Sequence, residues 1–470
     1  MRSLTRIGAI CAAVALLIPG AAQAAAARYV FLFIGDGMGL TQTLAAQLYL
    51  STLESDAYPP VPAALSYTGF QTVGLMHTQS ADSPVTDSAA AATAMASGRK
   101  TDNGILNEDP DTGEAYVPLA HTVKAGGRRV GLVTTCSLNH ATPAAFYAHA
   151  TDRYDYYEIG LQALRPGLLD FLGGGGFSKA SGPAGDQVKL TDTARERGFA
   201  VTSDAEEIRT LGPDAAPVIA QQPGTYTAPY MERELDRIYM PAETLSLAEM
   251  VEAAIRVLDD AAGFFLMAES GMVDTACAEN DAAGAIYEVL ALSDAVGAAV
   301  TFYERHPSDT LIVVLADHET GGLSLLRRTD LAVLAHQRAS FARFEEEVRA
   351  LLKKEAAYEA IEDAVEQWFG LKEETQAPLF RTEVRMLRAA YEATVRDELT
   401  EEEEELYQGL NPLAFTACKV MARHARLSFI TTGHTAQSVP VYAMGAGAEL
   451  FGGTYDNTAV YNKLIEAMGL

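Results

Sequence analysis

Five short apolar runs, rich in β-branched and aromatic residues, are spaced along the chain and separated by stretches with helical spacing of apolar positions. A run that is apolar at consecutive positions is typical of a strand buried on both faces of a parallel sheet. Strands that alternate with helices predict an α/β fold, in which helices cover both faces of a mostly parallel sheet. The predicted strands are residues 29–34, 130–135, 264–268, 310–316 and 427–432, and two of the predicted helices are Ser88–Ser97 and residues 245–258.

The stretch between the fourth and fifth predicted strands, at about residues 324–426, has a different character. It is charged and helix-rich, with long helical patterns at residues 341–354 and 381–406. We expect it to be a helix-rich insertion near the C-terminus of a single α/β domain that covers residues 25–470. Four consecutive glycines at residues 173–176 predict a flexible turn.

The first 24 residues have the pattern of a secretory signal peptide. Arg2 and Arg6 precede an apolar run at residues 7–18, and an Ala-x-Ala pattern at residues 22–24 fits a cleavage site. An uncleaved membrane anchor is the alternative, but the apolar run is shorter than the roughly 20 residues that span a bilayer. No later segment has transmembrane character, so we expect a secreted or periplasmic protein with no membrane span after signal removal.

The composition restricts the possible partners. The chain has 35 Lys and Arg against 62 Asp and Glu, and losing Arg2 and Arg6 with the signal takes the formal net charge from −27 to −29. Such acidity argues against a nucleic-acid-binding surface, which usually needs a basic face. An anionic substrate would need strong local positive charge, such as metal ions. The cysteines left after signal removal are Cys136, Cys277 and Cys418, an odd number without the spacing of a disulfide framework.

Residues of the kind that bind metals lie at or just after the carboxyl end of every predicted strand. In open α/β sheets this edge is where ligands bind. Five such coincidences, far apart in the sequence, predict one shared site. In strand order, the residues are Asp36, then His140 with Thr142, then Glu269, then Asp317 with His318, and finally His434.

Ser88 is the candidate nucleophile. Asp87 can cap the predicted helix Ser88–Ser97, Gly98 suits its C-terminal end, and Ser88 then lies in the first turn, where free amides and the helix dipole favour a phosphate. The alternative, a serine that only belongs to a capping pattern, is disfavoured by the surrounding ligand set. A serine hydroxyl needs activation, and without a G-x-S-x-G motif metal coordination is better supported than a Ser-His-Asp triad.

The candidate ligands divide by chemistry. Two divalent ions about 4 Å apart can hold the attacking and leaving oxygens of an in-line displacement. Nitrogen and oxygen donors that suit zinc are Asp36, Asp274, Asp317, His318 and His434, whereas the hard oxygen donors Glu269 and Thr142 suit magnesium. The guanidinium of Arg153 suits two phosphate oxygens, although an exposed arginine with no such role is the common alternative.

Five segments resemble those of the alkaline phosphatases and occur in that family's order across nearly the whole chain after the signal. They are FIGDGMG at residues 33–39, DSAA at residues 87–90, HATPAA at residues 140–145, ADHETGG at residues 316–322 and GHT at residues 433–435. The resemblance implies a doubly wound sheet, two zinc ions, one magnesium ion and a phosphoserine intermediate on Ser88.

The resemblance also implies a role for each residue. It assigns Asp36, Asp317 and His318 to the zinc ion beside Ser88, Asp274 and His434 to the other zinc ion, and Asp36, Thr142 and Glu269 to magnesium, with His140 close by and Arg153 on phosphate. The implied substrates are small phosphomonoesters, and inorganic phosphate is the product. A phosphodiesterase of the same superfamily and a low-activity phosphate- or metal-binding variant are the alternatives, and a homodimer is left open.

One family position departs from the pattern. The family's motif Glu-x-x-x-x-Asp-x-x-x-His matches at Glu269 and Asp274, but Ala278 stands where the histidine is expected. We expect the first zinc site to be weakened, with water in place of the imidazole. Cys277 and Glu279 are alternative replacement ligands.

Overall fold

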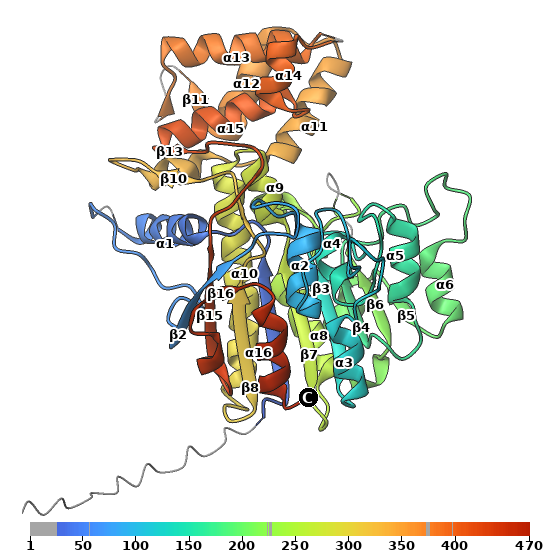
Figure 1. Ribbon diagram of the computed structural model, residues 1–470. Helices are drawn as coiled ribbons and strands as arrows, with labels where there is room; N and C mark the ends of the chain where they lie inside the picture. Colours follow the sequence, from blue (N-terminus) through green and yellow to red (C-terminus); the bar gives the residue numbers. More distant parts are fainter. Residues whose placement is uncertain (1–25, 56, 223, 225–227, 373–376, 397) are drawn as a thin grey trace, which may run out of the picture.

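A central ten-stranded sheet organises the computed structural model, which describes residues 26–470 except 56, 223, 225–227, 373–376 and 397 (Figure 1). The predicted signal peptide lies outside the described residues. All strands run parallel except β15, which is antiparallel to both of its neighbours. From one edge to the other the strands are β16 (Gly453–Asp456), β2 (Thr72–His77), β15 (Val439–Gly445), β8 (Thr310–Leu315), β1 (Tyr29–Gly35), β7 (Phe264–Ser270), β3 (Arg129–Thr134), β4 (Phe171–Gly174), β6 (Val218–Gln221) and β5 (Ala200–Thr202).

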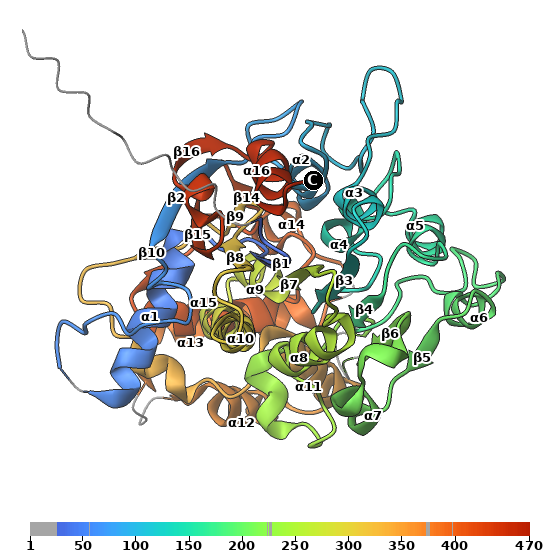
Figure 2. The same ribbon diagram turned by 90° about the horizontal axis from the view of Figure 1, so that it is seen from below.

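Helices cover both faces of this sheet, which confirms the predicted fold class (Figure 2). Burial explains why β1 and β8 are apolar at nearly every position, since their side chains are buried on both faces of the sheet. The helix α10 (Ala282–Tyr303) is long and apolar enough to cross a membrane, but it is mostly buried as a core helix against β1, β7 and β8. One face carries α8 (Leu247–Leu258) and α10 (Ala282–Tyr303), and the other carries α2 (Ser88–Ser97), α3 (Leu119–Ala125) and α16 (Ala459–Met468).

The register of the central strands sets the position of the site. Ile34 of β1 lies beside Glu269 of β7 and beside Leu315 of β8, so these three strands end together. The Asp36 amide then donates to the carbonyl of Ser270 at 3.2 Å. The first four predicted strands are therefore confirmed to within three residues at either end, and their carboxyl ends meet at one edge.

The prediction of a fifth sheet strand at residues 427–432 was wrong. Only β13 (Leu427–Ser428) forms there, and it pairs with β10 (Ser324–Leu325) outside the main sheet. The side chain of Ile430 is 75% exposed. A short apolar run does not reveal whether its side chains reach the core. The strand that enters the sheet is β15, a few residues later. The glycines at residues 173–176 likewise begin inside β4 rather than forming only a turn.

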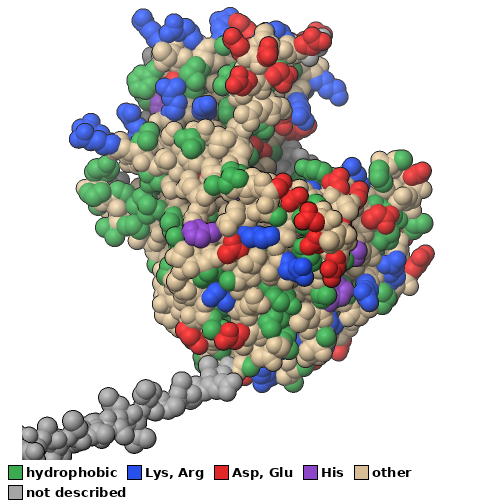
Figure 3. All heavy atoms as spheres, viewed as in Figure 1, with side chains coloured by type: hydrophobic (Ala, Val, Ile, Leu, Met, Phe, Trp, Pro, Cys, Tyr) green, Lys and Arg blue, Asp and Glu red, His purple; other side chains and the backbone are tan. Residues whose placement is uncertain are grey.

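The helices that follow β10 gather beyond the carboxyl ends of the strands (Figure 1). They are α11 (Phe341–Lys353), α12 (Tyr358–Phe369), α13 (Arg381–Thr394), α14 (Glu401–Tyr407) and α15 (Pro412–His424). The predicted single helix at residues 381–406 is in fact two, because Thr400 caps a new helix start by accepting from the Glu403 amide. The surface is indented between this cluster and the part of the protein formed by α5 (Tyr156–Ala163) and α6 (Leu190–Glu196) (Figure 3).

Candidate functional site

Three groups of potential metal ligands lie along the edge where β1, β3, β7 and β8 end. Within each group, one donor atom of every residue lies within 4.8 Å of the others. The groups are Asp36 with Asp317 and His318, Asp274 with His318 and His434, and Cys136 with His140 and Glu269. Because His318 belongs to two groups, the first two are adjacent.

The first group lies beside the hydroxyl of Ser88. The Nε2 atom of His318 lies 3.3 Å from the Ser88 Oγ, 3.3 Å from Asp36 Oδ1 and 3.2 Å from Asp317 Oδ2. Two backbone amides, those of Gly37 and His318, donate to the other oxygen of Asp317 at 3.2 and 2.9 Å. The Oδ2 of Asp317 and the Oδ1 of Asp36 have no hydrogen-bond partner although both are buried. Such atoms are the ones a bound cation would satisfy.

The protonation of His318 leads to the same conclusion. The Thr320 hydroxyl donates to Asp274, so at 3.3 Å it accepts from the Nδ1–H of His318. The Nε2 atom of His318 is then a bare acceptor that faces the carboxylate oxygens of Asp36 and Asp317. Facing acceptors repel unless a proton or a cation lies between them, and a divalent cation satisfies all of them at once.

Burial favours the neutral forms of these groups. It raises the pKa of Asp36 well above its usual value, and the charges of Asp317 and Asp274 raise it further. Burial also raises the pKa of Asp317 and lowers that of His318 well below the usual value for imidazole. A cation would stabilise the carboxylates, and it requires a neutral imidazole. The donor set therefore fits a divalent metal.

The second group joins α9 (Met272–Ala278) to the short ribbon of β14 (His434–Thr435) and β9 (Glu319–Thr320). The Nε2 of His434 lies 3.4 Å from Asp274 Oδ1, and its ring stacks on that of His318 with the centroids 3.6 Å apart. The Nδ1–H of His434 donates to the carbonyl of Thr86 at 2.8 Å, which leaves Nε2 free as a ligand.

The two alternative replacements for a histidine at Ala278 are engaged elsewhere. Both carboxylate oxygens of Glu279 accept from the Nη2 of Arg233, at 2.9 and 3.1 Å, and this ion pair is buried. The thiol of Cys277 is buried beside the amide of Gln42, 3.8 Å away. Neither residue belongs to the group formed by Asp274, His318 and His434.

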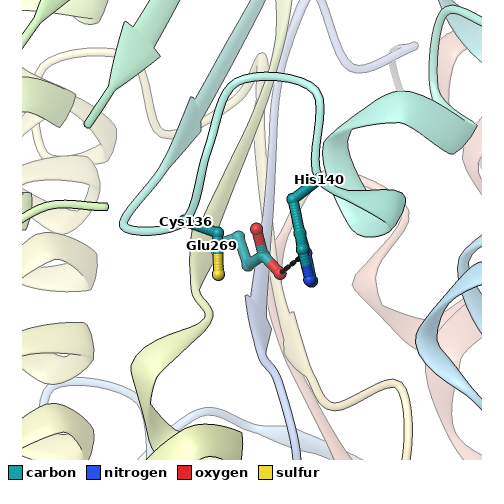
Figure 4. Close-up of side chains that lie close together, drawn as sticks. All are labelled: Cys136, His140 and Glu269. Carbon is teal, nitrogen blue, oxygen red and sulfur yellow. Dashed lines mark ion pairs between the residues drawn. The ribbon is translucent and has the colours of Figure 1, made fainter. Parts of the chain in front are cut away.

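The third group lies between β3 and β7 (Figure 4). One oxygen of Glu269 accepts from the Thr134 hydroxyl, and the other has no hydrogen-bond partner and lies 3.9 Å from His140 Nδ1. The hydroxyl of Thr142 is also buried and unpaired. Burial raises the pKa of Glu269 to about 7, and burial together with the charge of Arg153 lowers the pKa of His140 to about 3.

Arg153 is held at the N-terminus of α2. As expected, Asp87 caps this helix, with Oδ1 accepting from the Ala90 amide at 2.9 Å, and Gly98 ends it in the left-handed conformation. The Oδ2 of Asp87 accepts from Arg153 Nη1 at 2.9 Å. The other arm of the guanidinium lies 3.3 Å from His140 Nε2. The arginine is thus held by Asp87, the residue before Ser88, rather than free on the surface.

The structure brings every sequence-predicted site residue to this edge. Sequence reasoning missed three residues that orient or extend the set, Thr134, Cys136 and Thr320. It also missed that Asp87 accepts from Arg153. A signal existed for Cys136, because it directly follows a predicted strand as the other candidate ligands do.

Comparisons with known proteins agree with this geometry. The chain matches the family described as alkaline phosphatase over residues 27–470. Alkaline phosphatase 3 of Bacillus subtilis is 28% identical over 453 residues, which cover 94% of this chain and 89% of that protein. The crystal structure of Thermus thermophilus alkaline phosphatase aligns with a TM-score of 0.79 and 28% identity, covering 95% of this chain and 92% of that one. A cold-active alkaline phosphatase from Shewanella sp. aligns with a TM-score of 0.77 and 26% identity, covering 94% and 99%.

A match across nearly the whole chain, together with a serine nucleophile candidate set among metal-type ligands, assigns the family and the reaction class. The chain belongs to the alkaline phosphatase family and is a phosphomonoester hydrolase.

Proposed function

We propose that the chain hydrolyses phosphomonoesters through a phosphoserine on Ser88, with two zinc ions and one magnesium ion as cofactors. The observation that carries this proposal is the buried Ser88 hydroxyl at the start of α2, 3.3 Å from the Nε2 of His318 and beside unpaired carboxylate oxygens. The zinc ligands are Asp36, Asp317 and His318 in one site and Asp274 and His434 in the other, and Asp36, Thr142 and Glu269 hold magnesium with His140 adjacent.

The chain's own residues perform both transfers. Metal ions, when bound, supply positive charge to the phosphoryl oxygens and lower the pKa of the attacking oxygen. Ser88 Oγ forms the bond to phosphorus, the ester oxygen departs as the alcohol, and the phosphoryl group stays on the serine. Water then attacks the phosphoserine and restores the hydroxyl, releasing inorganic phosphate. The amides at the start of α2 and the guanidinium of Arg153 hold the phosphate oxygens.

One comparison of substrates tests the proposal directly. We expect the full chain, supplied with zinc and magnesium, to hydrolyse a simple aryl phosphate much faster than the matching aryl phosphodiester. A chelator should abolish the activity, and zinc should restore it. Preference for the diester would favour the phosphodiesterase alternative, and no turnover with any metal would favour a binding variant.

The first zinc site is proposed to be weak. This site has two protein ligands of its own, Asp274 and His434. Ala278 offers no donor atom, and Glu279 is paired with Arg233. Four ligands are the norm for zinc, so water would complete the set. We also propose that the protein is exported, on the pattern of residues 1–24.

Replacing Arg153 with Ala is expected to weaken inhibition by phosphate about tenfold or more and to lower kcat/KM by a similar factor. The side chain donates charge-assisted hydrogen bonds that strengthen as phosphate binds. The measurement is the inhibition constant of inorganic phosphate with an aryl phosphate as substrate.

The matched control is Arg165→Ala, since Arg165 is an exposed arginine. That change should leave both constants unaltered. An unchanged phosphate inhibition constant in Arg153→Ala would remove Arg153 from the phosphate site.

A further inference from the structure

Cys136 follows β3 directly and shares a small buried space with Glu269 and His140 (Figure 4). The residue Cys136 is 3% exposed, and its sulfur lies within 4.8 Å of one donor atom of Glu269 and one of His140. None of the five segments that resemble the family includes this residue. Its place in the ligand group is therefore not implied by the motif that assigned magnesium.

The space between the thiol and the carboxylate is kept open by Gly271. A Cβ atom at this position would lie 2.3 Å from the sulfur of Cys136 and 3.2 Å from the Oε1 of Glu269. The backbone of Gly271 has φ −77°, which any residue adopts, so the need for glycine is steric. A side chain there would fill the place where the two donors approach each other.

One hydroxyl positions both donors. Thr134 accepts from the amide of Cys136 at 2.8 Å and donates to the Oε2 of Glu269. That bond leaves Oε1 turned away from Thr134 with no hydrogen-bond partner, although the side chain of Glu269 is fully buried. The Nδ1 of His140 is likewise buried and unpaired. Buried polar atoms without partners are ones that a bound cation would satisfy.

We propose that Cys136 is a ligand of the third metal site, and that this site selects zinc or another thiophilic divalent cation over magnesium. Zinc accepts thiolate, imidazole and carboxylate donors together, whereas magnesium prefers six oxygen ligands in near-ideal octahedral geometry. On binding, the sulfur forms a bond to the metal and its proton is released to solvent. The inference rests on the proposed function in taking this group to be a metal site, and it replaces the magnesium that the family resemblance implies there by zinc.

Cobalt titration of the metal-free full chain tests this proposal, because a cobalt–thiolate bond gives a charge-transfer absorption band that carboxylate and imidazole ligands do not give. We expect the band to appear as cobalt fills the third site and to reach the intensity of one cobalt–thiolate bond per chain. Cys136→Ser and Cys136→Ala should both lose the band. Two different substitutions are used so that a folding defect in one of them does not decide the result. The matched control is Cys418→Ser, which changes another buried free cysteine and should keep the band.

Metal analysis then measures selectivity. We expect three zinc ions per chain after dialysis against zinc with excess magnesium. In Cys136→Ser, the zinc affinity of the third site should fall by at least about 100-fold, which exceeds the loss typical of residues that only orient a ligand. No thiolate band in the unaltered protein with three cobalt ions bound, or magnesium in the third site, would overturn the inference. An active enzyme without the band refutes only this inference, whereas an inactive protein with the band refutes only the proposed function.

Discussion

Ser88→Ala is expected to lower kcat/KM for an aryl phosphate by about a thousandfold or more. The serine oxygen is the atom that forms the bond to phosphorus, so the variant loses the covalent route and retains only direct attack by water. Mass spectrometry of acid-quenched enzyme should find a phosphate on the peptide that contains Ser88 in the unaltered protein and none in the variant. Substrate binding should persist, because Arg153 and the helix amides remain.

Ser97→Ala is the control on the same helix. Ser97 lies at the opposite end of α2 from Ser88. Its hydroxyl donates to the carbonyl of Thr93 and does not approach the ligand groups. This variant should retain full activity and the phosphopeptide. Turnover in Ser88→Ala at the unaltered rate, or phosphate on a different residue, would eliminate the proposed nucleophile.

Ala278→His is expected to increase the zinc affinity of the first site by more than about 100-fold and to raise activity steeply at low zinc. Residues four apart on a helix share a face, so a histidine at this position lies above Asp274 on α9. It would add a third protein ligand to Asp274 and His434. Losing a direct ligand lowers zinc affinity by more than the roughly 10- to 100-fold typical of residues that only orient a ligand. Zinc titration followed by activity and metal content measures the gain.

Ala278→Leu is the control, because it adds bulk without a donor atom. It should leave zinc affinity low, and any change that it shares with Ala278→His reflects packing. Two tightly held zinc ions in these sites of the unaltered protein, with no gain from the histidine, would show that the first site is complete. The ligand would then have to come from outside the Asp274, His318 and His434 group.

Much of the site followed from the sequence because two independent patterns coincide. Continuous apolar runs locate the central strands, and parallel strands place their carboxyl ends at one edge. Asp36 and Asp317 could thus be brought together although they are far apart in the sequence. Gly37, the residue after Asp36, is 280 positions from Asp317. Helix α2 was predicted at its observed ends, since Asp87 and Gly98 are strong local capping signals.

The rest depended on contacts that the pattern does not encode. His434 reaches the site from a two-residue ribbon paired with β9, not from the end of a sheet strand. The pairing of Glu279 with Arg233 joins residues on separate elements, so no local spacing reveals that this carboxylate is engaged. The contact of Asp87 with Arg153 could not be predicted, because capping of α2 already explains an aspartate at this position.

Helix α2 has a further consequence for the nucleophile that it carries. Apart from Ser88, seven of its nine residues are alanine or serine, and every side chain from Ser88 to Ala96 is buried. Alanine has no side-chain rotamers to lose, so folding this helix into the core costs little conformational entropy. Its close packing leaves no volume for larger residues. Directed evolution of this enzyme should therefore yield substitutions in the ligand-bearing loops, with α2 left nearly invariant among the improved variants.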